Sequence, residues 1–400
     1  MTQKNAEGAL PADAFASVGT RPFGVYLHVP WCSSRCGYCD FNTYVPGAIE
    51  AASPASFVDD AIAEIRIARA LMGEQNAKVS TVFFGGGTPT LLPASSLAAV
   101  LAAIDDQFGL AVDAEVTTEA NPESVNPNYF DELLEAGFTR ISLGMQSSAA
   151  SVLATLDREH TAGRAPQAAR EAFAAGFSEV SLDLVYGTPG ETDDQWQQSL
   201  HDALAAEPTH VSAYSLIVEQ GTKMARLVKS GVLEPTDDDV LARRYEWADE
   251  AFRQAGLSWY EVSNWARSGP NGFSMCRHNL GYWRNDDWLG IGAGAHSHVA
   301  GLRWWNHKHP ARCSAQVMAG ELPVADFERL TNSEQAVEEV MLRLRLAEGL
   351  PVDRIASQHR ADVDRLVSEG LLSPADAAAG LLALTPRGRL RADFVVRSLT

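Results

Sequence analysis

The side chains best suited to chemistry are three cysteines close together near the start of the chain. Cys32, Cys36 and Cys39 have a C-x3-C-x2-C spacing and follow an apolar run at residues 23–29 that predicts a β-strand. A loop this short can turn all three thiols toward one metal centre. An iron–sulfur cluster is usually held by four thiolates and a structural zinc ion by four ligands, so this loop needs a further donor in either case.

Two kinds of metal site remain open on spacing alone. In the first, the loop holds a zinc ion that is completed by Cys276, Cys313 or a histidine. In the second, the loop holds three irons of a four-iron cluster, and the fourth iron keeps an open coordination site. The amine and carboxylate of S-adenosylmethionine can chelate such an iron, and a reduced cluster can then pass an electron into the sulfonium group.

The cysteine loop and the segment after it resemble the radical S-adenosylmethionine superfamily. The loop has an aromatic residue, Tyr38, immediately before its third cysteine. One predicted helix later, glycines at residues 85–87 end a short apolar strand, where they let backbone amides and carbonyls approach a ligand. A glycine run is often only a turn, but at this place it is similar to the segment by which superfamily members hold the methionine amino group.

Predicted strands and helices alternate through the first half of the chain, which indicates an α/β fold. Alternation at this period is typical of parallel strands joined by right-handed crossovers. Six strands are fewer than the eight of a closed barrel, so the resemblance implies the incomplete (β/α)6 barrel of the superfamily. The strands are expected at residues 23–29, 80–84, 114–119, 140–146, 179–185 and 210–216, and the helices at 53–71, 94–108, 127–136, 164–175 and 192–206.

Polar residues fall where ligand-binding groups gather in such a barrel, at the carboxyl ends of the strands. Glu119, Gln146 and Asp183 lie in the last part of three successive predicted strands. Arg158 lies in a charged stretch that follows the second of these strands. Each residue also has a plain structural interpretation, because a carboxylate at a strand end often caps a helix or joins a salt bridge.

Four longer motifs narrow the resemblance. Residues 26–32, 84–90, 143–146 and 183–190 together resemble the family of oxygen-independent coproporphyrinogen III oxidases and their heme-chaperone relatives. The resemblance covers about residues 23–300. It implies that the cofactors are a 4Fe–4S cluster, held by the three cysteines of the loop, and S-adenosyl-L-methionine.

The resemblance also implies which residues contact the second cofactor. Carboxylates can accept from its ribose hydroxyls and its amine, and Arg158 can meet its carboxylate as a charge-assisted pair. Tyr38, next to the third cysteine, belongs to the same cofactor-binding set. The implied S-adenosylmethionine contacts are Tyr26, Gly86, Gly87, Thr88, Glu119, Gln146, Arg158 and Asp183.

A heme ligand is expected farther along the chain, in an H-N-x-x-Y-W pattern that begins at His278. Imidazole is a good iron ligand, and two aromatic rings offer a flat apolar face to a tetrapyrrole. The pattern resembles the signature that distinguishes the heme chaperones from the oxidases. Cys276 is a second candidate for the axial ligand. The plain alternative is a structural histidine that forms hydrogen bonds among aromatic neighbours.

Three features separate a heme chaperone from an oxidase of this family. The oxidases carry a further cysteine two positions after the third cluster ligand, where this chain has Phe41, and a longer N-terminal extension. Together with the H-N-x-x-Y-W pattern, these features imply a chaperone that passes heme to acceptor hemoproteins such as respiratory enzymes. The alternative is radical decarboxylation of coproporphyrinogen III propionates to vinyl groups in porphyrin biosynthesis. Thr188 and Glu191 replace residues more usual in the family.

The composition excludes several classes of protein. There are 51 acidic and 32 basic residues, a net charge of −19, and no cluster of Lys or Arg interrupts the acidic balance. Nucleic acid is not an expected partner, because binding it needs a basic face.

There is no run of about 18 apolar residues and no apolar signal-peptide core. Three of the five cysteines are packed too tightly for a disulfide framework, so a cytoplasmic protein is expected. Peripheral contact with a membrane-bound acceptor stays open.

Four regions are expected along the chain. Residues 1–22 are predicted to form a disordered lead-in and residues 23–235 the partial barrel. Residues 236–330 are predicted to form a family-specific α+β extension. Residues 331–400 resemble the winged-helix-like C-terminal domain of the family. This tail has no pronounced basic surface, so a structural or docking role is expected rather than nucleic-acid binding.

Local patterns predict two individual elements in the later regions. Residues 257–266 predict one strand that runs into a loop. Residues 381–388 predict a small hairpin before a final helix.

Overall fold

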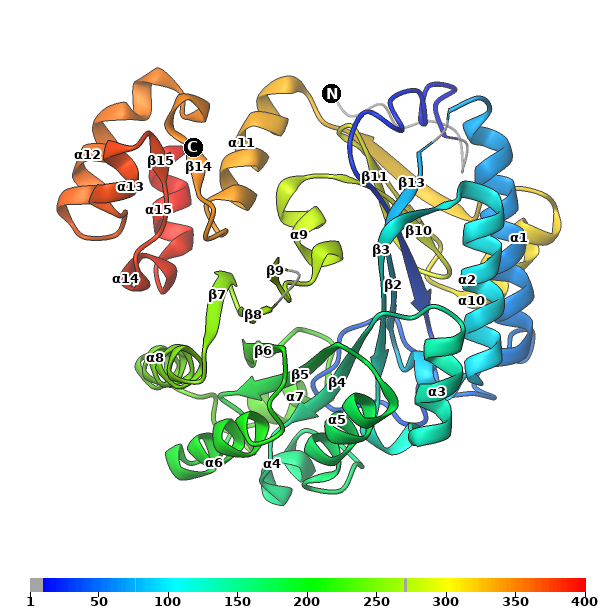
Figure 1. The fold of residues 1–400 in the computed structure, drawn as a ribbon, viewed down its shortest axis with the longest axis horizontal. Coiled ribbons are helices and arrows are strands. Elements are labelled where there is room, and N and C mark those ends of the chain that lie inside the picture. Colours follow the sequence, from blue (N-terminus) through cyan, green and yellow to red (C-terminus); the bar gives the residue numbers. More distant parts are fainter. Residues whose placement is uncertain (1–9, 76, 270–271) are drawn as a thin grey trace.

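The computed structural model describes residues 10–75, 77–269 and 272–400. Its central element is one large curved sheet (Figure 1). Parallel strands in chain order form the middle of this sheet, each hydrogen-bonded to the next. They are β1 (Phe23–Val29), β2 (Val79–Gly86), β3 (Leu110–Ala120), β4 (Arg140–Gln146), β5 (Glu179–Tyr186) and β6 (His210–Ser215). The predicted partial barrel is confirmed.

The helices between these strands cover the convex side of the sheet (Figure 1). Local capping sets where they begin: the Ser53 hydroxyl accepts from Ser56 N at one helix, and Thr192 begins a capping box at another. Apolar residues at helical spacing then face the sheet and join its core. The helices are α1 (Pro54–Met72), α2 (Ala94–Phe108), α3 (Pro127–Glu135), α4 (Ala150–Thr155), α5 (Arg164–Ala175) and α6 (Asp193–Leu204).

The chain after β6 adds strands to both ends of the same sheet. At one end, a strand pairs in parallel with the second edge of β1 and antiparallel strands continue from it: β10 (Asp287–Ile291), β11 (His296–Val299), β12 (Leu302–Asn306) and β13 (Val324–Arg329). At the other end, an antiparallel strand pairs with β6 and two more pair with it: β8 (Asn264–Gly269), β7 (Leu257–Glu261) and β9 (Gly272–Phe273). The region 236–330 therefore widens the barrel sheet.

The prediction of a strand that runs into a loop over residues 257–266 is confirmed for the strand, which is β7, and wrong for the loop, because β8 begins at Asn264. β7 and β8 form an antiparallel hairpin whose turn is Val262 and Ser263. A turn without glycine, proline, asparagine or aspartate carries little sequence signal, so the two strands look like one. The helices of this region are α7 (Lys223–Lys229), α8 (Asp238–Gln254), α9 (Arg277–Arg284) and α10 (Pro310–Met318). Of these, α9 lies on the concave side of the sheet (Figure 1).

The start of the described chain packs against the sheet. The prediction of a disordered lead-in is wrong for residues 10–22, because Phe15 is buried and its ring meets the Trp304 ring edge-on at 5.5 Å. Apolar residues are too sparse there to give a helical or strand period, so the pattern predicts no element. Residues 1–9 lie outside the described part of the chain.

The end of the chain has a small core of its own. The elements of this part of the chain are α11 (Asn332–Arg343), β14 (Leu350–Pro351), α12 (Arg360–Ser368), α13 (Pro374–Ala378), β15 (Leu381–Leu382), α14 (Pro386–Arg389) and α15 (Ala392–Leu399). Buried leucines and valines of α11, β14, α12, β15, α15 and the segments between them meet in this core.

The predicted hairpin over residues 381–388 is wrong. β15 pairs instead with β14, about thirty residues earlier in the chain. The reason is local: Thr385 caps a helix by accepting from Gly388 N, and Pro386 occupies its first turn. A helix therefore begins where the second strand of a hairpin would have to run.

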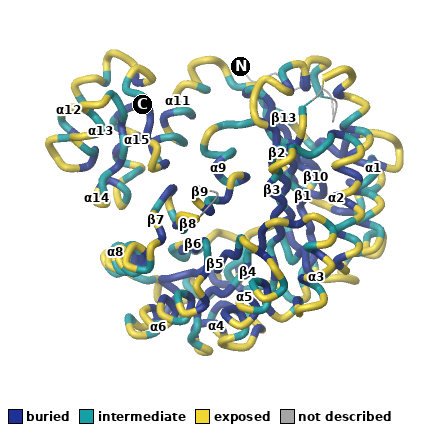
Figure 2. Tube along the Cα trace, viewed as in Figure 1, coloured by how far each residue is buried: buried dark blue, intermediate teal, exposed yellow. Residues whose placement is uncertain are grey.

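Buried residues follow the strands of the sheet, as the dark trace in Figure 2 shows. Aliphatic and aromatic side chains between the sheet and its helices form one core. On the concave side, the middle strands carry small hydroxyl side chains that line a cavity. Closed barrels fill this space with bulky branched residues, so hydroxyls leave room for a ligand. These residues are Thr117, Ser142, Ser181 and Ser212.

Candidate cofactor site

A cavity of about 710 Å³ lies on the concave side of the sheet. It is lined by the cysteine loop, by residues of β1 to β6 and by α9. The structure brings every predicted cofactor-binding residue to this one cavity. They are Cys32, Cys36, Cys39, Tyr26, Tyr38, Gly86, Gly87, Thr88, Glu119, Gln146, Arg158, Asp183 and His278.

Backbone hydrogen bonds to neighbouring segments hold the cysteine loop. Thr88 N, just after β2, donates to Trp31 O at 2.8 Å. Gly37 N donates to Leu156 O at 3.1 Å, and Met224 N donates to Gly37 O at 2.8 Å. The loop is therefore fixed from β2 on one side and from the α4 and α7 segments on the other.

Two polar side chains point donors at the thiols. Thr88 Oγ1 lies 3.6 Å from Cys32 Sγ, and Arg158 Nη1 lies 3.6 Å from Cys36 Sγ. Burial raises the pKa of Cys32 and raises the pKa of Cys39 to about 11, so these two thiols are protonated in the metal-free protein. Metal ligation reverses this preference, because a coordinating thiol is deprotonated.

The donor set fits a four-iron cluster better than a zinc ion. Among the described residues, no three His, Cys, Asp or Glu side chains gather closely enough to hold one ion. Tetrahedral zinc needs each thiolate within about 2.3 Å of the same atom, whereas each thiolate of a cluster binds a different iron. Cys313 donates to His307 O at 2.9 Å, and Cys276 donates to Glu115 at 3.7 Å. Neither Cys313 nor Cys276 therefore adds a fourth ligand to the three cysteines of the loop.

The glycine run at the end of β2 sets the position of the cysteine loop. Gly86 has a φ of 106°, and a Cβ on it would lie 2.7 Å from the His28 ring. A Cβ on Gly87 would lie 2.5 Å from Trp31 O, directly before the first cysteine. Side chains here would push the loop away from β2. The run thus has a packing role besides the ligand contact that the sequence predicts.

Two half-buried carboxyl groups line the cavity from β3 and β5. Glu119 Oε2 accepts a hydrogen bond from Gly86 N at 3.2 Å. Burial and the nearby Asp183 carboxylate raise the pKa of Glu119 to about 8. Burial also raises the pKa of Asp183, although Ser142 donates to its Oδ2 at 2.8 Å. Two such groups side by side favour a ligand that brings a cation or hydroxyl donors.

Gln146 sits at a break in the ladder between β4 and β5. The register shifts between Gly144 and Gln146, and Gln146 has a φ of 60°. Left-handed backbone costs free energy in a residue other than glycine, and bulges of this kind redirect side chains next to functional sites. Arg158 Nη2 donates to Gly144 O at 3.3 Å, so the bulge also anchors this arginine.

A histidine without a predicted role links Tyr26 to the cysteine loop. His28 Nε2 lies 3.0 Å from Asn42 O, which can only accept, so Nε2 carries the proton. His28 Nδ1 then accepts from Tyr26 OH at 3.0 Å. Burial lowers the pKa of His28, which keeps the ring neutral. The i, i+2 spacing, which places both residues on one face of a strand, was the sequence signal for this pair.

His278 lies at the inner end of the cavity, and both of its ring nitrogens are engaged. Nδ1 lies 2.8 Å from Thr81 Oγ1, and Nε2 lies 2.8 Å from Tyr282 OH. Burial lowers the pKa of His278 to about 3, so the ring is neutral. The ring stacks on Phe83 with centroids 5.3 Å apart. These contacts are those of a structural histidine, and ligation of heme iron by His278 stays a prediction.

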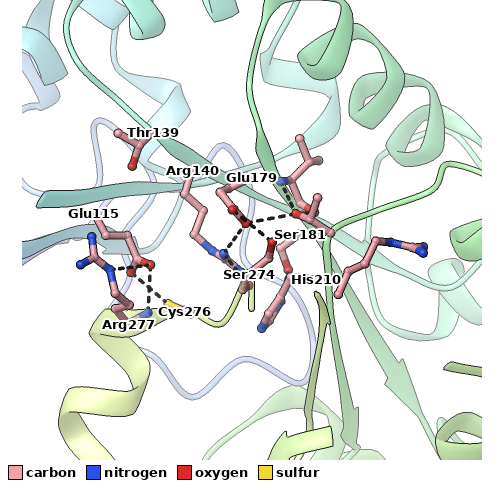
Figure 3. A network of polar contacts seen from close by, with 12 residues as sticks. Glu115, Thr139, Arg140, Glu179, Ser181, His210, Ser274, Cys276 and Arg277 are labelled. Carbon is pink, nitrogen blue, oxygen red and sulfur yellow. Dashed lines mark hydrogen bonds and ion pairs between the residues drawn. The ribbon is translucent and has the colours of Figure 1, made fainter. Parts of the chain in front are cut away.

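A polar network joins the first residues of β4 and β5 to the segment that leads into α9 (Figure 3). Arg140 donates to Ser274 O at 2.9 Å and pairs with Glu179 at 3.3 Å. Glu115 accepts from Arg277 N at 2.9 Å and thereby caps the first turn of α9. The network fixes α9 against β3 and β4. Its members lie far apart in the sequence, so no local motif could have predicted it.

Comparisons with known proteins agree with this geometry. The radical SAM superfamily model matches residues 26–203, and the HemN C-terminal domain model matches residues 330–391. The chain is 50% identical over 400 residues to the heme chaperone HemW of Mycobacterium tuberculosis, which covers 100% of both chains. The chain belongs to the HemW family.

Other relatives extend the comparison. The heme chaperone HemW of Bacillus subtilis is 32% identical over 92% of this chain and 97% of that protein. A mouse protein, radical S-adenosyl methionine domain-containing protein 1, mitochondrial, is 37% identical over 74% of this chain and 65% of that one. Among solved structures, coproporphyrinogen III oxidase HemN of Escherichia coli has a TM-score of 0.80 at 21% identity, over 97% of this chain and 92% of that chain. This last likeness shows that the HemW family and HemN share a fold.

The HemW family is part of the radical SAM superfamily, which implies a 4Fe–4S cluster and S-adenosylmethionine as cofactors. The three thiols fit the cluster, since donors from Thr88 and Arg158 face two of their sulfurs. The role of each single residue toward these cofactors stays a prediction.

The two departures from the usual family sequence lie away from this HemW cavity. Thr188 and Glu191 follow β5 but do not line the cavity. Glu191 accepts from Gly187 N at 2.8 Å and pairs with Arg244 at 2.7 Å. Glu191 therefore ties the turn after β5 to α8.

Proposed function

We propose that this protein is a heme chaperone that holds heme and passes it to acceptor hemoproteins such as respiratory enzymes. The observation that carries the proposal is the 50% identity, over complete chains, to proteins named heme chaperone HemW. The match includes both the residues of the cavity and the C-terminal domain. Both parts that the heme chaperones have are therefore present in this chain.

In this proposal Cys32, Cys36 and Cys39 hold a 4Fe–4S cluster whose open iron binds S-adenosylmethionine. When bound, the cluster supplies an electron donor next to the sulfonium group. The residues around the loop keep the sulfurs in the thiolate form. The Thr88 hydroxyl and the Arg158 guanidinium, each 3.6 Å from a sulfur, favour the charged form.

The same proposal assigns the polar groups around the loop to S-adenosylmethionine. Glu119 and Asp183 accept from its amine and its ribose hydroxyls. Arg158 lines the cavity beside the cysteine loop, and its guanidinium suits a pair with the carboxylate of the ligand. Gln146 and Tyr26 complete the surroundings of the ligand.

An oxidase that decarboxylates coproporphyrinogen III is the alternative function. It would use the same cluster and the same S-adenosylmethionine contacts, so the cavity alone does not separate the two. Phe41 stands where the oxidases of the family carry a further cysteine. This difference and the full-length identity to heme chaperones favour the chaperone.

We also propose that the protein works in the cytoplasm and touches membrane-bound acceptors from outside the bilayer. Its five cysteines are all free thiols, which suits a reducing compartment. In the part of the chain that the structure describes, no helix has both the length and the apolar character that a membrane span requires.

The decisive experiment offers both substrates to the same preparation. The anaerobically reconstituted protein is incubated with S-adenosylmethionine, a reductant and either coproporphyrinogen III or heme. We expect stable heme uptake, transfer of heme to an apo-hemoprotein, and no decarboxylated porphyrin. Decarboxylated product without heme uptake would reject the chaperone.

A further inference from the structure

Two large apolar side chains stand exposed where the cavity opens to the surface. Phe41, just after the cysteine loop, is 56% exposed, and Ile217, just after β6, is 66% exposed. Both line the cavity described above. A single exposed apolar residue needs no explanation, but two from distant segments at one opening mark a place where a ligand binds.

A hydrogen bond of the neighbouring residue anchors the chain beside each of these side chains. Asn42 Nδ2 donates to Ala293 O at 2.9 Å, and Leu216 N donates to Tyr186 O at 2.8 Å. The chain positions that carry the two apolar side chains are therefore set before a ligand arrives. This lowers the entropic cost of binding.

One arginine adds a positive charge to the same opening. Arg35 is exposed and lines the cavity, and it donates to Cys39 O at 3.5 Å rather than to a carboxylate among the described residues. Asp40 and Glu219 also border the opening and carry negative charge. A ligand with an apolar body and a carboxylate would therefore place its carboxylate at Arg35 and its body against the apolar side chains.

The inner end of the cavity offers less to a large ring. Both nitrogens of His278 are engaged by Thr81 and Tyr282, so iron ligation there would break two hydrogen bonds. Arg140, which lines the cavity there, is already engaged by Ser274 and Glu179. The opening has exposed apolar surface and a cation without such obstacles.

We propose that the mouth of the cavity receives heme, with the macrocycle against Phe41 and Ile217 and one propionate paired with Arg35. This inference rests on the proposed chaperone function and adds the place where heme sits. An acceptor can reach heme at the mouth without any opening of the barrel. It also gives Phe41 a task at the position that separates this chain from the oxidases.

The first test measures heme affinity by titrating hemin into the reconstituted protein and following heme absorption. Phe41→Ala and Ile217→Ala should each weaken binding about tenfold, the change expected from losing one well-packed apolar contact. Phe273→Ala and Val232→Ala are matched controls, because these residues are 50% and 68% exposed but do not line the cavity. Both controls should bind heme like the unchanged protein.

The second test changes the ligand instead of the fold. The unchanged protein should bind heme about tenfold more tightly than heme dimethyl ester, which lacks the propionate charges. Arg35→Gln should bind the two ligands with equal affinity. Iron and sulfide content, measured for each variant, shows that the cluster is retained.

The outcomes separate this inference from the function on which it rests. If Phe41→Ala and Ile217→Ala bind heme like the unchanged protein while His278→Ala does not, the mouth is the wrong place and the chaperone function stands. Equal affinity of the unchanged protein for heme and its ester overturns the role of Arg35. If the unchanged protein takes up no heme at all, the proposed function fails and this inference fails with it.

Discussion

Glu119 holds a proton at neutral pH because burial and Asp183 raise its pKa to about 8. The free energy needed to ionise this group is recovered only when a cation binds beside it. S-adenosylmethionine carries a sulfonium and an amine, so its binding should be coupled to loss of this proton.

We therefore predict that S-adenosylmethionine binds more tightly as the pH rises toward 8. Below the raised pKa the neutral acid must ionise before it pairs with the cation, so affinity falls by up to about tenfold per pH unit. Calorimetric titration between pH 6 and pH 9 measures this slope. Glu119→Gln removes it, and since the titration of the ligand itself is common to both proteins, equal slopes would contradict the prediction.

Loss of one thiol should remove the cluster and keep the fold. Cys36→Ala leaves the loop with two thiols and leaves Arg158 without its sulfur neighbour, so the absorption of the reconstituted cluster should disappear. Far-ultraviolet circular dichroism should stay unchanged, because the loop is fixed by its backbone. Cys313→Ala is the control and should keep its iron; iron retained by Cys36→Ala would show that this thiol is no ligand.

Residues in local motifs could be predicted from the sequence, and residues that act through distant contacts could not. The three cysteines, Glu119 and Asp183 stand in or next to recognisable segments and all line the cavity. Glu115, which caps α9, becomes meaningful only once the fold places it beside Arg277. Single-chain patterns carry no signal for such a pairing.

At the scale of elements, the cysteine loop depends on the end of β2. Thr88 N donates to Trp31 O at 2.8 Å, and the glycine before it leaves no room for a side chain. The position of the sulfurs is thus set by a neighbouring strand as well as by the loop.

Gly87→Ala should displace this loop. The new Cβ would lie 2.5 Å from Trp31 O, which is backbone and cannot move alone. We expect a loss of about 1–3 kcal/mol in the free energy of unfolding and a several-fold lower cluster occupancy. Urea unfolding and iron analysis measure the two effects.

Gly269→Ala is the matched control for this substitution. Its added Cβ would meet Gly272 O at an ordinary 3.5 Å, so stability and iron content should change little. Equal effects of the two substitutions would show that the cysteine loop does not need close approach at Gly87.

Two helices with a clean apolar period and a glycine directly after them were predictable within a residue. The predicted helices at 94–108 and 164–175 are the observed α2 and α5. The β7–β8 hairpin was missed because Val262 and Ser263 are weak turn formers. The weak sequence signal of the turn, rather than the strand propensity of its neighbours, limits the accuracy of the prediction in this segment.

At the scale of the whole molecule, the C-terminal domain meets the barrel at α8 and β7. Arg389 pairs with Asp249 at 2.9 Å, and its guanidinium lies 4.0 Å from the centre of the Trp259 ring. Ala347 N donates to Tyr260 O at 2.8 Å. These contacts join the small C-terminal core to the sheet.

Arg389→Gln should loosen this joint. Its side chain is 16% exposed and that of Asp249 is 24% exposed, so the ion pair and the ring contact together should contribute about 1–2 kcal/mol. Urea unfolding measures the loss. Arg253→Gln breaks a solvent-exposed pair with Glu250 and should leave the midpoint unchanged. Equal urea midpoints for Arg389→Gln and Arg253→Gln would contradict a stabilising contact between the C-terminal domain and the barrel.

The order of the sheet could be predicted only in part. Six parallel strands follow from alternation, but their neighbours at both ends come from later segments. No local pattern states that residues 287–291 lie beside residues 23–29. Pairings of this range are decided by packing of the complete chain.

β1 pairs with β10, a strand that is synthesised much later in the chain. Phe23 lies opposite Asp287, so the first strand leaves the ribosome long before its second partner has been made. Until then its free edge is a template for joining other nascent chains. Truncated chains that end at residue 286 should accumulate as aggregates during expression, while chains that end at residue 330, after β13, should stay largely in the supernatant after centrifugation.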